Sequence, residues 1–467
     1  MNGRFINGAI DKHEKGAKPM SSFRYLPMTD EDQVNMLKTI GAGSIGELFA
    51  DIPASVRYQG DLPIEEALNE TALLKEMSRL EKKNVHTKDY PSFLGAGVYE
   101  HYIPSVVNHM LLRSEFYTAY TPYQPEISQG ELQGIFEFQS MICELTGMEV
   151  ANSSMYDGPT ALAEAAMMAA GHTKKTKILV SEAVHPEARE VLATNARAQR
   201  LELVEIPLKD GMTDIDKLRS SLDENVGSVL IQYPNFFGQV EDLQSIEEIV
   251  HNEKAMFVVS SNPMSLGVLQ APGHLGADVV VGDAQPFGIP SQLGGPHCGY
   301  FAVNKKLMRK VPGRLVGETE DRHGQRGFVL TLQAREQHIR REKATSNICS
   351  NQALNALAVS ISMSLLGKQG FRELSEQNIQ KAHYAKRKLK ENGVPVVYET
   401  PFFNEFVIQL TKPVKEVNES LLAEGMIGGL DLGRFYRGRE DQMLAAVTEL
   451  RTKEEIDRFT TVLGGLI

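Results

Sequence analysis

The sequence predicts an α/β protein whose central sheet is mostly parallel, with flanking helices, a helical N-terminal arm and a small C-terminal α+β domain. Short runs of valine, isoleucine and leucine alternate with helical segments through the middle of the chain. Such continuously apolar runs are typical of parallel strands that are buried on both faces. The expected strands are residues 177–181, 201–206, 228–233, 256–259, 278–281 and 300–303, and the expected helices between them are residues 186–198, 214–222 and 243–251.

The N-terminal part is expected to form a leader followed by a helical arm, residues 23–130. Residues 1–22 are polar and lack the apolar core of a secretory signal, so they are interpreted as a disordered leader or extension. Helical periodicity predicts helices over residues 30–40, closed by Gly41, and over residues 64–80. Residues 93–133 are rich in glycine, proline and tyrosine and are expected to form a long irregular loop, which is often a functional feature.

Two further domains are expected, a large α/β domain over residues 131–350 and a small α+β domain over residues 351–467. The large domain opens with an amphipathic helix over residues 131–147, in which Gly147 suits the C-cap. The expected elements of the small domain are helices over residues 352–366, 371–391 and 453–463 and strands over residues 394–398 and 405–409.

Composition excludes several classes of protein. The chain has 467 residues and a formal net charge of -11, which argues against a general nucleic-acid-binding role. Its three cysteines are far apart and form no CxxC pair, which argues against a disulfide framework or zinc site and for a reducing compartment. No stretch is apolar for long enough to span a bilayer. We therefore expect a cytoplasmic protein that binds neither nucleic acid nor a membrane.

The segment of residues 152–160 (NSSMYDGPT) has the form of an anion site. It precedes an alanine-rich helix, and Pro159 fits the first turn of that helix. Backbone N–H groups at a free helix N-terminus bind phosphate readily. Asp157 could instead cap the helix itself, and its carboxylate would repel a phosphate. The local sequence leaves both readings open.

A second segment, residues 276–299, is an expected strand followed by a polar turn and a glycine-rich loop. The layout is similar to that of fold type I enzymes that use pyridoxal phosphate (PLP), in which a lysine after this strand holds the cofactor as a Schiff base. Gln285 replaces the PLP lysine here, and no lysine occurs between Lys254 and Lys305. A glutamine amide forms no Schiff base. Residues 257–263 also lack the carboxylate that such enzymes place beside the pyridine nitrogen.

Two longer motifs make the resemblance specific. Residues 118–130 (TAYTPYQPEISQG) and 331–349 (TLQAREQHIRREKATSNIC) are similar to segments of the glycine-decarboxylating P-proteins of the glycine cleavage system. The segments around Asp157 and Gly294 match as well, and the likeness runs from about Arg24 to the C-terminus. The chain resembles the alpha subunit, the N-terminal half, of this family.

The resemblance implies an oxidoreductase subunit, part of a glycine dehydrogenase that is aminomethyl-transferring and decarboxylating. PLP would be bound by the partner beta subunit, not covalently by this chain, in an assembly of two alpha and two beta chains. The active site would lie at the contact between the two kinds of chain. Glycine would lose carbon dioxide there, and its aminomethyl group would pass to the lipoyl arm of the H-protein. This chain would be inactive without its partner.

Three residues of the tyrosine-rich loop are the candidate catalytic residues: Tyr120, Tyr123 and Glu126. The loop could close the shared pocket and exclude water. The alternative is interface packing, because tyrosine is common at protein contacts.

A basic run and one histidine are further candidates. Arg335, Arg340, Arg341 and Lys343 could guide an anionic cofactor, a substrate carboxylate or the acidic H-protein, or could form structural ion pairs.

His185 follows a strand, where active relatives of the fold stack a ring on the cofactor; here it is expected to be a relic or a capping group. The other histidines show no metal-ligand spacing.

Two alternatives to a catalytic half-partner are considered. One is a free-standing PLP enzyme that uses Lys305 or Lys306, but these lysines follow a strand, begin a helix and should point the wrong way. The other is a non-catalytic scaffold or docking subunit of the same complex.

Overall fold

The structure is a computed structural model and describes Tyr25 and residues 27–58, 63–65, 67–291, 295–332, 337–344, 346–348 and 351–466. The expected leader, residues 1–22, lies outside these residues, as do Gly294, Arg335 and Cys349. Residue contacts divide the chain into two units, Met1–Asn84 and Val85–Ile467. The domain boundaries expected after residues 130 and 350 stay predictions.

The first unit contains α1 (Asp30–Ile40), η2 (Ile45–Phe49) and α2 (Glu70–Glu81). Gly41 closes α1 in the left-handed region, as expected. The helix predicted from residue 64 begins only at Glu70, because the Asn69 side chain accepts a hydrogen bond from the Ala72 N–H and caps the helix there. Neither α1 nor α2 has a buried residue.

The second unit is built on a seven-stranded sheet in the order β1-β9-β8-β7-β6-β2-β3. Neighbouring strands from β8 to β3 are parallel, and β9 is antiparallel to both of its neighbours, which confirms a mostly parallel sheet. The strands are β1 (Val150–Ala151), β2 (Lys177–Ser181), β3 (Glu202–Ile206), β6 (Val226–Tyr233), β7 (Met256–Ser261), β8 (Val279–Asp283) and β9 (Gly299–Val303). A separate small pair joins β4 (Leu208–Lys209) to β5 (Met212–Thr213).

Helices cover both faces of this sheet. One face packs against α5 (Gln129–Thr146), α8 (Ile215–Ser221), α9 (Leu243–Asn252) and the 3-10 helix η4 (Pro263–Gly267). The other packs against α6 (Gly158–Thr173) and α7 (Pro186–Ala198). Along β7 successive side chains alternate between the two cores, since Phe257 belongs to the first and Val258 to the second.

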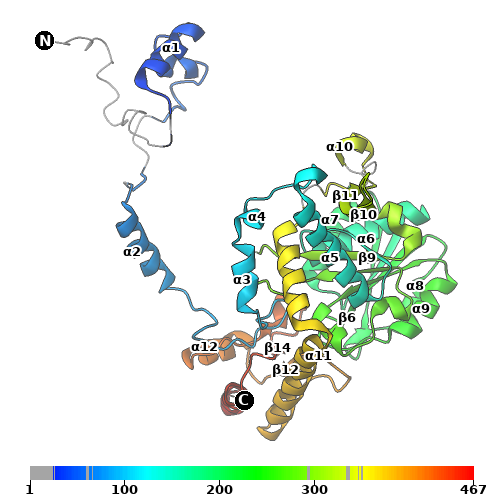
Figure 1. The fold of residues 1–467 in the computed structure, drawn as a ribbon. Helices are drawn as coiled ribbons and strands as arrows, with labels where there is room; N and C mark the ends of the chain where they lie inside the picture. The colour runs from blue at the N-terminus through cyan, green and yellow to red at the C-terminus, as the bar shows by residue number, and fades with distance from the viewer. Residues whose placement is uncertain are drawn as a thin grey trace, which may run out of the picture. The chain divides into compact units, whose positions relative to one another are not determined.

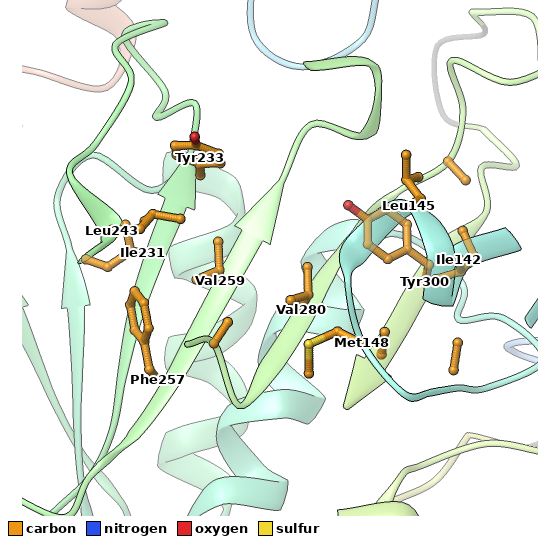
Figure 2. Packing of buried hydrophobic residues seen from close by; sticks show 14 of the residues in the cluster. Ile142, Leu145, Met148, Ile231, Tyr233, Leu243, Phe257, Val259, Val280 and Tyr300 are labelled. Carbon is orange, nitrogen blue, oxygen red and sulfur yellow. The ribbon is translucent and has the colours of Figure 1, made fainter. Parts of the chain in front are cut away.

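Figure 2 shows the first of these cores. Ile231, Phe257, Val280 and Tyr300 come from four neighbouring strands, and Ile142 of α5 packs on the same side. All of these side chains are buried. The continuous apolar runs therefore arise because both faces of each central strand are covered.

The small C-terminal domain contains a three-stranded antiparallel sheet in the order β12-β14-β13. Its strands are β12 (Glu405–Gln409), β13 (Leu430–Asp431) and β14 (Gln442–Ala446), and its helices are α12 (Val414–Ala423) and α13 (Lys453–Leu466). The long helix α11 (Ala353–Glu391) runs from the large sheet into this domain (Figure 1). At Gly367 its backbone leaves the helical region, so the two predicted helices are two segments joined at that residue.

Some elements differ from expectation. The strand expected over residues 394–398 is reduced to an isolated bridge between Val396 and Ile408. The loop expected over residues 93–133 contains α3 (Ser105–Leu111), α4 (Ser114–Tyr117) and η3 (Pro125–Ile127). A hairpin of β10 (Leu315–Glu320) and β11 (Arg326–Thr331) was not expected. The remaining short helices are η5 (Pro272–Leu275), η6 (Lys305–Lys310), α10 (Gln337–Arg340), η8 (Arg341–Lys343) and η9 (Leu432–Arg434). Within the described part of the chain, no helix is long and apolar enough to cross a membrane.

Candidate functional site

A cavity of about 260 Å³ opens at the edge of the sheet where the parallel strands β6, β7 and β8 end. Ligands of open α/β sheets bind at this edge, outside the carboxyl ends of the strands. The N-termini of α6 and α7 also reach it, through Gly158 and His185. Because four carboxyl side chains line this space, we refer to it as the carboxylate-lined cavity; they are Asp157, Glu187, Asp283 and Glu405.

Gln285, at the position expected for a cofactor lysine, bonds through its amide nitrogen and its backbone N–H, whereas its buried Oε1 has no hydrogen-bond partner among the described residues. Its side chain is buried and does not line the cavity. The amide Nε2 donates to the carbonyl oxygens of Ile289, at 2.7 Å, and Tyr99, at 3.3 Å. Its backbone N–H donates to Asp283 Oδ1 at 2.9 Å. Gln285 thus fixes the turn after β8 and presents no nucleophile to the cavity.

The end of β7 offers no charge for a pyridine nitrogen. Ser261 and Asn262 stand there in place of a carboxylate. The Ser261 hydroxyl lies 2.7 Å from the Tyr300 hydroxyl, and Asn262 Oδ1 accepts from the Met264 N–H at 3.0 Å. Both side chains are used within the fold.

The N-terminus of α6 is capped by the chain's own carboxylates. Asp157 Oδ1 accepts from the Thr160 N–H at 2.7 Å, and Asp283 Oδ2 accepts from the Gly158 N–H at 3.2 Å. Asp283 also forms an ion pair with His297 at 3.3 Å. Of the two readings left open by the sequence, the structure has the self-capped helix. A phosphate placed here would meet two carboxylates at close range.

His185 is a capping residue, one of the two roles expected for it. Its Nδ1 accepts from the Glu187 N–H at 3.2 Å, while Nε2 lies 3.2 Å from the Ala96 carbonyl oxygen. These contacts fit a neutral ring that carries its proton on Nε2. Burial lowers the pKa of the ring, which favours that neutral form. The ring edge packs on Phe236, with centroids 4.9 Å apart.

Charge decides whether PLP fits. Among the described residues that line the cavity there are four carboxyl groups and no lysine or arginine. Burial raises the pKa of Glu405 to about 7, an effect partly offset by hydrogen bonds from Tyr99 and the Ala96 and Gly97 N–H groups. The residues present do not fit a phosphorylated cofactor, because no cation offsets its charge and no amine can hold its aldehyde.

Lys305 and Lys306 cannot replace the missing amine. Both lie in η6, directly after β9. Because β9 is antiparallel to β8, with Val303 paired to Val279, β9 ends at the sheet edge opposite the cavity. Lys306 Nζ also pairs with Asp278 at 3.1 Å.

The tyrosine-rich loop lies elsewhere on the surface. Tyr120 and Tyr123 are 79 % and 68 % exposed and line a separate hollow of about 500 Å³; Glu126 is exposed as well. The structure brings none of these three candidates to the carboxylate-lined cavity. Gln129 fixes the loop to β11, donating to the Phe328 carbonyl oxygen at 2.9 Å and accepting from its N–H at 2.8 Å.

The basic run forms part of a second cavity. Arg340 and Lys343 line it together with Arg309 and Lys310 of η6, whereas Arg335 lies outside the described residues. Arg341 is exposed nearby in η8. The sequence analysis did not predict that these two basic segments line the same cavity. The signal that could have found it is residues 305–310 (KKLMRK), a second basic run in an acidic chain.

The strand order and the cavity at the strand ends define the fold class of the fold type I PLP-dependent enzymes. A sphingosine-1-phosphate lyase of Burkholderia pseudomallei K96243 shares this fold, with a TM-score of 0.65 at 14 % identity over 88 % of this chain and 93 % of that one. The chain belongs to the glycine cleavage system P-protein family, which matches residues 23–463.

Two relatives illustrate this membership. A crystal structure of a glycine decarboxylase (P-protein) of the glycine cleavage system, in inhibitor-bound form, is 42 % identical, with a TM-score of 0.85. The likeness covers 95 % of this chain and 100 % of that one. A probable glycine dehydrogenase (decarboxylating) subunit 1 of Bacillus cereus (strain ATCC 10987 / NRS 248) is 67 % identical over 443 residues, 95 % of this chain and 99 % of the relative.

Proposed function

We propose that this chain is a subunit of glycine decarboxylase that acts with a PLP-bearing beta subunit. Together the two chains decarboxylate glycine and transfer the aminomethyl group to the lipoyl arm of the H-protein. The observation that carries the proposal is a cofactor fold whose cofactor position is occupied by Gln285 and by the capping carboxylates Asp157 and Asp283. In a family of glycine decarboxylases, such a chain needs a partner that holds the cofactor.

The contribution proposed for this chain is to complete the partner's pocket. The exposed Tyr120, Tyr123 and Glu126 project from a loop that Gln129 fixes to β11, so they are presented by a supported surface. Packed against the partner, the two aromatic rings would exclude water from the shared pocket, and the Glu126 carboxylate would offer a hydrogen-bond acceptor.

A scaffold role is the second candidate, and one observation favours it. Every candidate residue of the loop lies away from the carboxylate-lined cavity, and the polar groups of that cavity named above bond within the chain. A subunit that only holds its partner or docks the H-protein would need no more than this.

The decisive experiment is glycine–bicarbonate exchange with H-protein, run with this chain alone, with the beta subunit alone and with the mixture. PLP absorbance is recorded in each case. We expect neither a PLP imine band nor exchange from this chain alone, and both from the mixture. Exchange by this chain alone would overturn the proposal.

Loop variants separate the two candidates. Tyr123→Phe removes one hydroxyl, Glu126→Gln removes one charge, and neither changes the size of its side chain much. A loss of kcat on the order of tenfold or more, with assembly intact, supports the site role. Normal turnover in both variants leaves the scaffold role.

Sedimentation of the mixture tests the proposed two-alpha, two-beta assembly, and fractionation of cells tests the proposed cytoplasmic location.

A further inference from the structure

The second cavity, which the basic run helps to form on the outer side of α6, has no part in the function proposed above. It has a volume of about 240 Å³ and lies between α6, η6 and the segment that contains α10 and η8. We call it the basic groove and define it by Met167, Met168 and Ile348 on its floor and by Arg309, Lys310, Arg340 and Lys343 at its rim.

The rim of the groove carries cations only. All four of its basic side chains are exposed, and no aspartate or glutamate is among the described residues that line it. Arg309, Lys310 and Lys343 form no ion pair with any residue that the structure describes. Glu342 is the single acid in the described part of the neighbouring segment, and it does not line the groove. In a chain of net charge -11, this concentration of positive charge calls for an anionic partner.

The floor of the groove is apolar. Met167 and Met168 project from α6 and Ile348 from the far wall, and all three are buried. Methionine side chains adapt to the shape of what packs on them and are frequent at binding surfaces. The occupant therefore combines carboxylate or other anionic groups with an apolar side chain.

The exposure of the rim distinguishes a protein partner from a small anion. Sites for small anions hold them by buried donors and helix N-termini. Here the cations stand in solvent, and they come from two segments about thirty residues apart in the chain. Exposed complementary charge of this kind steers the encounter of proteins that bind and leave again.

We propose that the basic groove is the docking site for an acidic surface of the H-protein, with one apolar side chain of that protein on the methionine floor. The inference rests on the proposed function, because the H-protein is the partner that must arrive and depart in each cycle. The permanent partner is better matched by another face. Tyr117, Tyr120 and Ile127 are exposed there, and aromatic residues, not lysines, are enriched in stable interfaces.

The test reverses charge at the rim in the complete complex. The variant is Lys310→Glu with Lys343→Glu; the matched control is Lys217→Glu with Lys415→Glu, two exposed lysines outside the groove that give the same change in net charge. The KM for H-protein and kcat are measured in glycine–bicarbonate exchange at several salt concentrations. We expect the KM for H-protein to rise on the order of tenfold, with kcat changed less than about twofold and a weaker salt dependence.

Three other outcomes overturn the docking site. The KM for H-protein can match that of the control, the rim variant can fail to sediment with the beta subunit, or H-protein binding can be competed by inorganic phosphate at concentrations where chloride has no effect. The second outcome would make the groove a subunit contact, and the third a small-anion site. An inactive wild-type complex would count against the proposed function instead, and calorimetric titration of H-protein into that complex would still test the groove.

Discussion

At the scale of single residues, Gln285 has a structural role at the position where a cofactor lysine was expected. The glutamine amide nitrogen donates to the carbonyl oxygen of Ile289, in the turn that follows β8, and to that of Tyr99, in a segment far away in the sequence. Nearby, Asp157 and Asp283 satisfy the backbone groups that would otherwise face a phosphate. Several side chains thus fill the place that the cofactor takes in PLP-dependent enzymes of this fold.

A lysine placed at residue 285 should therefore not restore cofactor binding. In Gln285→Lys we expect no imine band on addition of PLP, because the phosphate would still lie against Asp157 and Asp283. Borohydride reduction followed by peptide mapping gives the readout. The wild-type chain is the control for background labelling of surface lysines. Stoichiometric labelling of the new lysine would contradict the explanation.

At the scale of elements, one position shows how a turn is tied to the packing of the small domain. Gly238 lies in the left-handed region at φ +83, and its N–H donates to the Asn235 carbonyl oxygen at 2.9 Å. A Cβ on Gly238 would overlap the backbone carbonyl of Glu405 in β12. The absent side chain therefore lets the loop after β6 lie directly against a strand of the small domain.

Gly238→Ala should destabilise the chain far more than a matched glycine substitution. Gly324, in the hairpin turn, has a similar φ of +76 but nothing near its Cβ position, so Gly324→Ala carries the backbone cost alone, about 1–2 kcal/mol. Gly238→Ala adds the overlap with β12, and we expect a loss of at least about 3 kcal/mol. Urea unfolding measures both variants. Equal losses would show that β12 moves away at no cost.

The central elements could be predicted from the sequence because their apolar runs report burial directly. Residues 177–181 and 186–198 have the expected bounds, and the central sheet is mostly parallel as expected. The hairpin of β10 and β11 was not expected, because three of the eleven residues 316–326 are acidic and its strand β10 is exposed at its outer end. At residues 394–398 the apolar side chains pack into the core of the small domain and into an adjacent hydrophobic cluster. They are buried there although the backbone forms only an isolated bridge and no regular strand.

The candidate site, like the fold, could be predicted from the sequence only in part. The missing lysine and carboxylate could be predicted, since each is a matter of residue identity at the end of an apolar strand. Asp157 was one of the caps that the sequence allowed for α6, but the second carboxylate could not be predicted, because Asp157 and Asp283 are 126 positions apart and meet only through the sheet. The basic groove likewise depends on η6 and α10 lying side by side on α6.

At the scale of the whole unit, two buried glutamates attach the segment of residues 96–102 to the small domain. Glu405 Oε1 accepts from the Ala96 N–H at 2.7 Å. Glu449 accepts from the His101 ring, at 2.9 Å, and from the Tyr102 N–H, at 2.6 Å. Burial raises the pKa of both carboxyl groups; for Glu449 the His101 charge and the hydrogen bonds more than compensate and leave its pKa below the ordinary value.

The two glutamates should give opposite pH dependence. Since the folded pKa of Glu405 is raised from 4.5 to about 7, its contribution to stability is lost as pH rises through that window. The free energy of unfolding of Glu405→Gln, relative to that of the wild type, should therefore rise by about 3 kcal/mol between about pH 4 and pH 8. The contribution of Glu449 is present at neutral pH and lost in acid, so Glu449→Gln should be the less stable chain at neutral pH and approach the wild type in acid. Urea midpoints across this range give the comparison, and parallel curves for the two variants would contradict it.

The capped N-terminus of α6 has a consequence for how the complex shares its cofactor. Under the proposed function, a subunit that satisfies its own helix end with Asp157 and Asp283 would not compete with its partner for PLP. If the partner carries PLP as proposed, a titration of the assembled enzyme would saturate at one equivalent per pair of chains. When PLP is scarce, every PLP molecule would then go to a chain that can use it.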